Sequence, residues 1–365
     1  MSNRTIILTI FLIFSSLFPA KISASEPTEN EVSAHDTIQP ATAHHDAKEG
    51  KLDMTALAFE HILDSHYWHF WGEGEGTVAA PLPCIIYSNT KGLQFFMSSV
   101  FEHGHATYNG YRLEEEKIIS EDEQESVYDF SITKNVMQLL LSATLMFWLF
   151  TSIARAYKNT GVTSAPKGKQ SFFEPVITFV RDDIAKNNIG AKSDRFVPYL
   201  LTVFFLILIN NILGMVPIGA NLTGNIAFTM VLATFTLILT NVNGNKHYWK
   251  HILLPPVPKA LYIMMIPLEI IGIFTKPFAL MIRLFANMTA GHMIVISLIG
   301  LIFMFETLWI SPISVAFTLF IDILECLVAI LQAFIFTLLT SLFIGSAVAD
   351  HHEEAHEGEE HKAAH

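Results

Sequence analysis

The stretch that decides the fold runs from Pro267 to Leu298 and reads PLEIIGIFTKPFALMIRLFANMTAGHMIVISL. It is apolar over more than the roughly 20 residues that a helix needs to cross a bilayer, so it predicts a membrane-spanning helix. Ionisable groups inside such a helix cost about 2.5–3.5 kcal/mol each and therefore point to function. The strongly polar members of this stretch are Glu269, Lys276, Arg283, Asn287 and His292.

A second stretch of the same kind, ISVAFTLFIDILECLVAILQAFIFTLLTSL, runs from Ile313 to Leu342 and carries Asp322, Glu325 and Gln332. The apolar segments around both stretches, about 260–305 and 313–348, are longer than a straight crossing needs. At about 1.5 Å per residue, each helix is expected to be tilted or bent. Pro267 and Pro277 are natural bend points in the first of them.

Shorter apolar segments at about 135–154, 196–216 and 226–242 predict three further spans. The expected fold is therefore an all-α integral membrane protein with about five spans. Its two C-terminal helices are long and tilted, and an exported N-terminal extension precedes the spans. Between the first two spans, residues 172–184 have near-helical apolar spacing and predict an amphipathic helix on the membrane surface.

Residues 1–25 have a basic start, an apolar run and small residues after it, the pattern of a signal peptide; an uncleaved membrane anchor is the alternative. Residues 26–130 predict a periplasmic extension that is partly disordered, with short strands around 84–88 and 93–97. The acidic run 114–125 is expected to be solvated. Residues 131–349 form the expected transmembrane domain, and 350–365 a polar cytoplasmic tail.

Lysine and arginine concentrate in the loop after the first span and in the loop before the fourth. Loops rich in these residues stay in the cytoplasm. The N-terminal region then lies outside the cell inner membrane, in agreement with the signal peptide, and five crossings place the C-terminus inside.

Composition agrees with a membrane protein and excludes some classes. Of the 365 residues, 51% are hydrophobic and only 15% are charged, against about a quarter in soluble domains. The formal net charge of −12 argues against nucleic-acid binding, which needs a basic face. Neither Cys84 nor Cys326 belongs to a zinc or redox motif, so we expect no cofactor or metal. The His-rich tail could bind metal, but a solvated tail is the simpler interpretation.

The polar residues of the two long stretches fall into register if the helices are antiparallel and Arg283 and Gln332 lie at one depth. His292 is then about 13.5 Å, and Glu325 about 10.5 Å, nearer the outside, so the imidazole and the carboxylate share a depth. Asp322 lies one turn further out on the same face. Glu269 lies about 21 Å from Arg283 towards the cytoplasm.

This order predicts two polar half-paths separated by a buried guanidinium that stays protonated. His292 and Glu325 can relay protons because their surroundings readily move their pKa values. Asn287 and Gln332 can form hydrogen bonds without adding charge. Structural ion pairs between helices remain the alternative for these groups, and above all for Asp322. Lys276 is better explained by snorkelling to the cytoplasmic interface.

The segment RLFANMTAG, from Arg283 to Gly291, resembles the RLFxNMxAG motif of subunit a of F-type ATP synthases. LQAFIFTLL (331–339), the pair Lys276–Pro277 and NNILGMVP (210–217) fit the same family, so the resemblance covers about 130–350. It implies that Arg283 faces the carboxylate of the rotating c-ring. It also implies that Gln332 and Asn287 lie near that arginine, and that Glu269 lies on the inner half-channel.

Many bacterial members have Glu and His where this chain has His292 and Glu325, so the pair is exchanged. The resemblance implies proton translocation through two offset half-channels, coupled to ATP synthesis. The implied partners are the c-ring, the peripheral-stalk b subunits and membrane lipid. The subunit is expected to be non-catalytic, since no GxxxxGK[ST] nucleotide loop is present. A secondary transporter and a non-catalytic anchoring protein are the rival classes; an internal repeat, which a transporter would show, is not evident.

Overall fold

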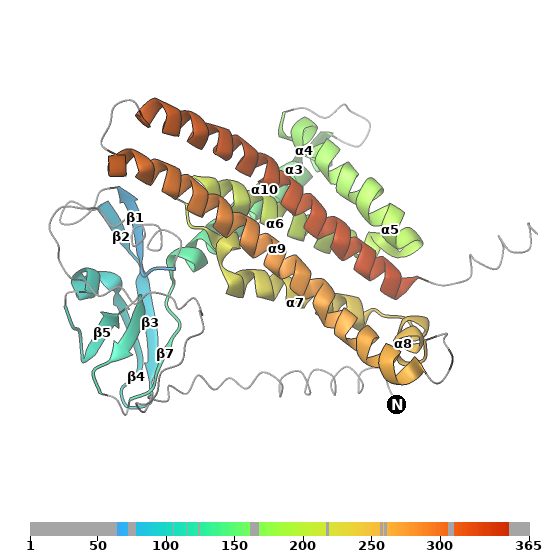
Figure 1. Ribbon diagram of the computed structural model, residues 1–365, viewed down its shortest axis with the longest axis horizontal. Helices are drawn as coiled ribbons and strands as arrows, with labels where there is room; N and C mark the ends of the chain where they lie inside the picture. The colour runs from blue at the N-terminus through green and yellow to red at the C-terminus, as the bar shows by residue number, and fades with distance from the viewer. Residues whose placement is uncertain are drawn as a thin grey trace, which may run out of the picture. The chain divides into compact units, whose positions relative to one another are not determined.

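A computed structural model describes residues 64–71, 78–104, 106–114, 116–122, 125–160, 168–216, 219–255, 258, 261–305 and 310–349. The expected signal peptide, the leader as far as residue 63 and the polar tail lie outside the described residues. The remainder forms a strand-rich part before residue 130 and a helical part after it (Figure 1).

The strand-rich part has seven strands among the described residues. β1 (Tyr67–Trp71) pairs with β2 (Val78–Pro81), and β5 (Tyr111–Glu114) pairs with β6 (Lys117–Ser120), both antiparallel. The third sheet has the order β4 (Gly92–Met97), β3 (Pro83–Ser88), β7 (Val127–Asp129). The two strands expected from sequence correspond to β3 and β4. A 3-10 segment, η2 (Ser98–Gly104), follows β4.

The strand-rich part has a small hydrophobic core, which packs on one face of the three-stranded sheet. Alternate residues of β3 and β4 point inward, as a strand's period of two requires. The buried apolar side chains are Cys84, Ile86, Phe96, Phe101, Tyr111 and Ile118. The expectation that the run 114–125 is solvated is wrong at two positions. Ile118 belongs to this core, and Glu125 is buried.

Glu125 is buried because donors surround its carboxylate. The hydroxyls of Ser88 and Thr90 donate to Oε1, Tyr111 donates to the same oxygen at 2.9 Å, and Ser120 donates to Oε2 at 2.8 Å. These hydrogen bonds, those from Ser88 and Thr90 first, lower the pKa of Glu125 to about 2. Lys91 Nζ lies 3.7 Å from Oε2. A buried charge of this kind is tolerated because it is paired and hydrogen-bonded.

The helical part contains a helix at each of the five segments expected from sequence to span the membrane. Long apolar helices are α3 (Lys134–Thr160), α6 (Val197–Met215), α9 (Tyr262–Phe305) and α10 (Ile310–Val348). A fifth crossing is available if α7 (Ile226–Val242) and α8 (Lys246–Leu253), which meet at 102°, form one broken span. The prediction of a helical membrane protein with about five spans is thereby confirmed.

The expected amphipathic segment is also helical. It consists of α4 (Lys169–Thr178), a π-helical segment η3 (Phe179–Lys186), the short α5 (Asn187–Ile189) and a 3-10 segment η4 (Gly190–Arg195). Val180 and Ile184 pack into the main core, while Arg181 is exposed and pairs with Asp182. One side of the segment is thus apolar and the other charged.

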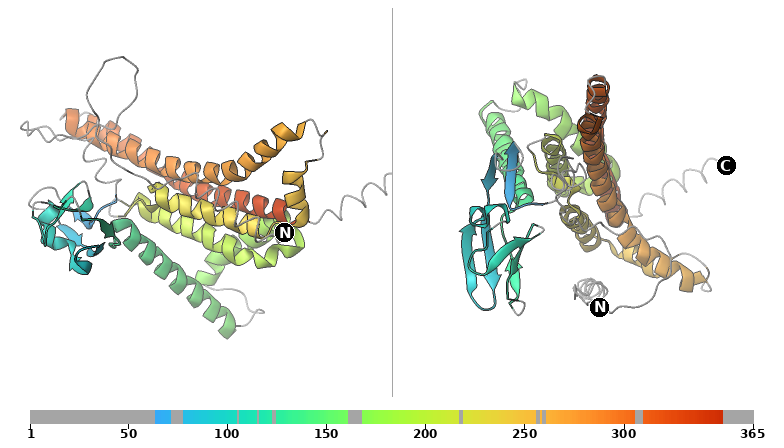
Figure 2. Two further views of the ribbon diagram at one scale, coloured as in Figure 1. Left: turned by 90° about the horizontal axis from the view of Figure 1, so that it is seen from below. Right: turned by 60° about the vertical axis from the view of Figure 1, so that its left-hand side comes forward.

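α9 and α10 run side by side over most of their length, and α6 packs against α10 (Figure 1). The N-terminal part of α9, which carries Pro267 and Pro277, bends away from the rest of the helix (Figure 2). Between α6 and α7, the 3-10 segment η5 (Leu222–Gly224) precedes Asn225, which caps α7. Gln138 of α3 fixes this loop by exchanging two hydrogen bonds, of 2.5 and 2.6 Å, with the backbone of Ala220.

Candidate functional site

The polar groups of α9 and α10 meet across the interface of the two long helices. His292 Nδ1 lies 3.2 Å from Glu325 Oε1. The side chain of Glu325 is only 8% exposed and that of His292 18%. The contact agrees with the common depth that antiparallel helices assign to these two residues. An imidazole and a carboxylate at hydrogen-bond distance can pass a proton between them.

Gly291 makes this contact possible. A Cβ at this position would lie 2.7 Å from Glu325 Oε1 and 2.9 Å from its Cδ, closer than real Cβ contacts allow. The carboxylate therefore rests directly on the backbone of α9, next to His292. The sequence signal was available, because glycine inside a helix costs about 1 kcal/mol relative to alanine and needs a packing reason.

Five residues before His292 on α9, a second polar pair joins the same two helices. Asn287 Nδ2 donates to Gln332 Oε1 at 3.0 Å. Gln332 is 4% exposed, and its Nε2 has no hydrogen-bond partner in the part of the chain that the structure describes. The pair is neutral, so it can orient protons or water without the cost of a further buried charge.

A small cavity connects the two pairs. It measures about 10 Å³, and Asn211, Asn287, Glu325 and Gln332 supply its polar lining. A volume of this order holds about one water molecule. Asn211, on α6, donates through Nδ2 to the carbonyl of Ala329 at 3.2 Å. Its Oδ1 is buried without a partner among the described residues. Sequence reasoning missed Asn211 as a site residue, although a buried amide within a span was a signal.

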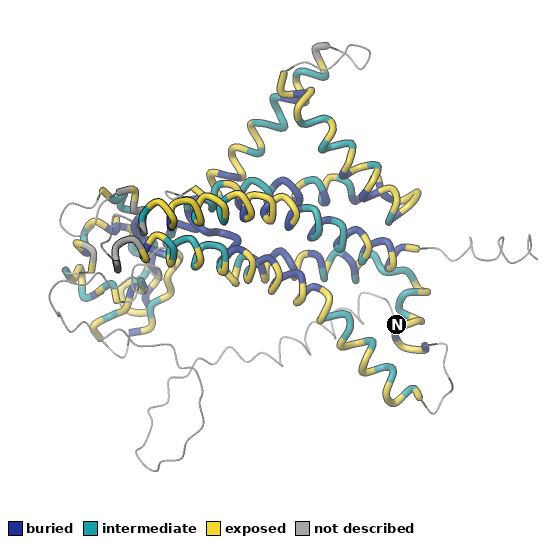
Figure 3. Tube along the Cα trace, turned by 45° about the horizontal axis from the view of Figure 1, so that its top comes forward, coloured by how far each residue is buried: buried dark blue, intermediate teal, exposed yellow. Residues whose placement is uncertain are grey.

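Arg283 lies on α9 one turn from Asn287, with a different environment. The expectation of a buried guanidinium is wrong for this chain alone, because Arg283 is exposed. No hydrogen bond or ion pair holds its side chain within the described residues. The two long helices expose one side over much of their length (Figure 3), and many of the side chains exposed there are apolar. These exposed side chains include Ile282, Ile294, Leu324, Leu327, Val328 and Leu331.

The remaining acids lie apart from Arg283. Asp322 is half-buried one turn from Glu325, close enough to interact electrostatically with Glu325 and His292. Glu269 is half-buried near the other end of α9, on the side of Tyr248 of α8. Lys276 is exposed, and its Nζ lies 5.7 Å from the ring of Phe343. The structure therefore joins four of the expected residues in two contacts and leaves Arg283, Glu269 and Asp322 outside them.

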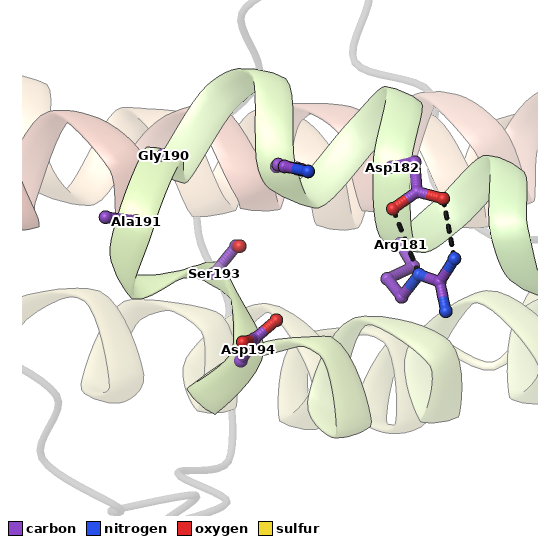
Figure 4. Close-up of a pocket in the computed structure, with 7 residues that line it drawn as sticks. Arg181, Asp182, Gly190, Ala191, Ser193 and Asp194 are labelled. Carbon is purple, nitrogen blue, oxygen red and sulfur yellow. Dashed lines mark hydrogen bonds and ion pairs between the residues drawn. The ribbon is translucent and has the colours of Figure 1, made fainter.

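A larger pocket of about 660 Å³ lies elsewhere, between η3 and η4 (Figure 4). Arg181 and Asp182 form an exposed ion pair on its rim, with Nη2 to Oδ2 at 2.7 Å, and Asp194 lies opposite. Both charges of the pair are satisfied in solvent, so we do not regard this pocket as the functional site. Within the described ranges, no three His, Cys, Asp or Glu residues are grouped to hold a metal ion.

Comparison with known proteins decides the family. A family model described as ATP synthase A chain matches residues 136–345, more than half of the chain. The chain belongs to this family. The match covers every helix that carries the polar pairs, and it confirms the resemblance carried by RLFANMTAG and LQAFIFTLL. Together with the long apolar helices, it establishes a multi-pass membrane protein.

Individual proteins similar to this chain support the same family. The chain is 48% identical over 236 residues to an ATP synthase subunit a of Chloroherpeton thalassium, covering 63% of this chain and 71% of the relative. It is 38% identical over 357 residues to an ATP synthase subunit a 2 of Chlorobium luteolum, covering 95% and 89%. Residues 57–139 match a second family model, a domain of unknown function (DUF8433). The strand-rich part thus has relatives of its own.

Proposed function

We propose that this chain is the stationary proton-conducting subunit of an F-type ATP synthase. Membership of the ATP synthase A chain family implies proton translocation in that complex. The observation that carries the proposal is the contact between His292 and Glu325 in the interface of two spanning helices. Ionisable groups in that position are expensive and are kept where a proton path needs them.

The path has two halves. On the periplasmic side of Arg283, His292 and Glu325 carry the proton, and Asp322 lies further out. The amides of Asn287 and Gln332 lead from this pair inward to Arg283. On the other side, Glu269 receives protons on the way to the cytoplasm. The carboxylate and imidazole are exchanged relative to many bacterial members, and either order supplies one acid and one base. Coupling the two halves to ATP synthesis requires a carrier that moves between them.

The exposed face of α9 and α10 supports a c-ring as that carrier. Arg283 is a charged group on an apolar face with no partner in the described chain, so its partner belongs to another molecule. A carboxylate on each c subunit would neutralise it in passing, and the guanidinium would favour release of that carboxylate's proton. The arginine itself stays protonated and so blocks a direct leak between the halves. Peripheral-stalk b subunits would hold this chain against rotation.

The orientation proposed from the basic loops has structural support. Lys192 Nζ donates to the carbonyl of Val348 at 3.3 Å, and Asn245 Nδ2 donates to the same carbonyl at 2.7 Å. The end of α10 therefore lies on the same side as the two loops rich in Lys and Arg. This arrangement favours a cytoplasmic C-terminus and a periplasmic N-terminal region in the cell inner membrane.

The test is ATP-driven acidification of inverted membrane vesicles that contain the assembled complex. Glu325→Gln keeps the shape of the side chain but removes its titratable group. Pumping should therefore be lost, while the subunits that hydrolyse ATP remain bound to the membrane part of the complex. Asp182→Asn, at the exposed pair of η3, is the matched control and should pump normally. Full pumping by Glu325→Gln would contradict the proposed path.

A further inference from the structure

The three-stranded sheet β4-β3-β7 has an outer face made of apolar and aromatic side chains. Leu93 and Phe95 of β4 are 71% and 69% exposed, and Phe130, just after β7, is 66% exposed. Tyr87, Met97 and Tyr128 are exposed on the same sheet. We call this set, together with Pro83 and Ile85 between them, the outer sheet face.

The strand register makes the outer sheet face continuous. Tyr87 lies opposite Leu93 on one side and Tyr128 on the other. Ile85 lies opposite Phe95, and the amide of Phe130 donates to the carbonyl of Ile85 at 2.8 Å. Directly opposed side chains on a sheet are neighbours, about 5 Å apart at Cβ. These side chains therefore form rows across three strands rather than scattered exposed residues.

The opposite side of the sheet already holds the core of this part, built on Cys84, Ile86 and Phe96. The outer sheet face is thus not needed to close that core. Its eight positions, 83, 85, 87, 93, 95, 97, 128 and 130, include no Lys, Arg, Asp or Glu. A contiguous exposed apolar patch of this kind marks an interaction surface. The absence of charge favours an apolar partner over an acidic or basic one.

The position of this face in the chain identifies the partner. The amide of Ile132 donates to the carbonyl of Pro83 at 3.0 Å, so pairing with β3 extends to two residues before α3. At the start of α3, the amide of Lys134 donates to the carbonyl of Ser65 at 2.9 Å, and Asp64 accepts from Thr133 and Asn135. The sheet is therefore joined to the first span by hydrogen bonds, and Phe130 lies within about 14 Å of Lys134 along the chain.

We propose that the outer sheet face docks on the lipid surface at which α3 begins. Tyrosine concentrates at the boundary between headgroups and acyl chains, where its apolar ring and its polar hydroxyl are both satisfied. Tyr87 and Tyr128 would lie at the headgroups, with Phe95, Leu93 and Phe130 reaching towards the acyl chains. Docking would hold the strand-rich part flat on the bilayer beside the first span.

The experiment places a nitroxide at Phe95→Cys in the assembled complex, reconstituted in vesicles of phosphatidylcholine and phosphatidylglycerol. Cys326→Ser removes the exposed native thiol, and the buried Cys84 stays unlabelled only while this part is folded. Ile119→Cys is the matched control, an exposed apolar residue on β6 outside the outer sheet face. Collision rates are measured with oxygen, which concentrates in lipid, and with a water-soluble nickel chelate.

Lipid docking predicts a several-fold loss of collisions with the nickel chelate at position 95 relative to position 119, together with a gain in collisions with oxygen. Equal access of the chelate to both positions would overturn the proposal, since the face would then be in water. Protection from both reagents would also overturn it, because the face would then be covered by protein, such as a partner subunit or the segment before residue 64.

Discussion

The Nδ1 atom of His292 on α9 lies 3.2 Å from the Oε1 atom of Glu325 on α10, over a glycine that leaves room for the carboxylate. The two residues are 33 positions apart in sequence and come from antiparallel helices. Their contact places one base and one acid at the same depth of the spanning part. The residues are also next to the Asn287–Gln332 pair, which continues the polar line towards Arg283.

Exchange of the two residues should preserve function where single changes do not. His292→Glu alone places two carboxylates in contact, and Glu325→His alone places two imidazoles there. We expect each to lower ATP-driven pumping by roughly 10²-fold, the usual contribution of a positioned acid or base. The double variant restores one of each and should recover most of the rate. Additive losses in the double variant would show that the two residues do not act as a pair.

Gly291→Ala should reduce pumping although alanine favours the helix by about 1 kcal/mol. The new Cβ would occupy the place of the Glu325 carboxylate and push it away from His292. The control is Gly272→Ala on the same helix, where an added Cβ meets no atom within 4 Å. Pumping should be unchanged in the control. If Gly291→Ala pumps as well as the control, then the close approach of Glu325 to α9 is not required.

The stability of the strand-rich part should depend on pH through Glu125. Its pKa is lowered to about 2 from an ordinary value near 4.5, with hydrogen bonds from Ser88 and Thr90 as the main cause. The stabilisation is therefore complete above about pH 4.5 and is lost as the pH falls towards 2. In a Cys326→Ser background, the reactivity of the buried Cys84 thiol with dithiodipyridine should rise as the pH falls over this range. In the Glu125→Gln variant, the strand-rich part should be less stable at neutral pH, and its stability should depend less on pH. A pH profile unchanged by this substitution would contradict the stabilising role of the Glu125 carboxylate.

Much of the helical part could be predicted from sequence because a bilayer demands about 20 apolar residues per span. The five apolar segments correspond to α3, α6, α7, α9 and α10 within a few residues. The depth match of His292 and Glu325 followed from helix rise alone. Asn211 was missed because its position against the site depends on how α6 packs against α10, which no periodicity reveals.

The strand-rich part was less predictable. The alternation of apolar and polar residues indicated β3 and β4, but β6 lies in the acidic run 114–125, whose composition indicates exposure to solvent, and β5 ends where that run begins. Glu125 is buried there partly because hydroxyls of Ser88 and Thr90, more than thirty residues earlier, donate to its carboxylate. Arg283 is the opposite case. Its position within a span predicts that its side chain is shielded from water. The sequence does not tell whether this chain or a partner provides the shielding.

Proton flux through vesicles that carry Arg283→Ala in the assembled complex tests most directly whether Arg283 separates the two half-paths. We expect ATP-driven pumping to be lost with assembly intact, and passive proton leak to rise because the two half-paths are no longer separated. Lys276 is an exposed cation two turns away on the same helix. Vesicles that carry Lys276→Ala should pump normally and show no rise in passive proton leak. Normal coupled pumping by Arg283→Ala would contradict the role of Arg283 as the separator and leave it with a structural role.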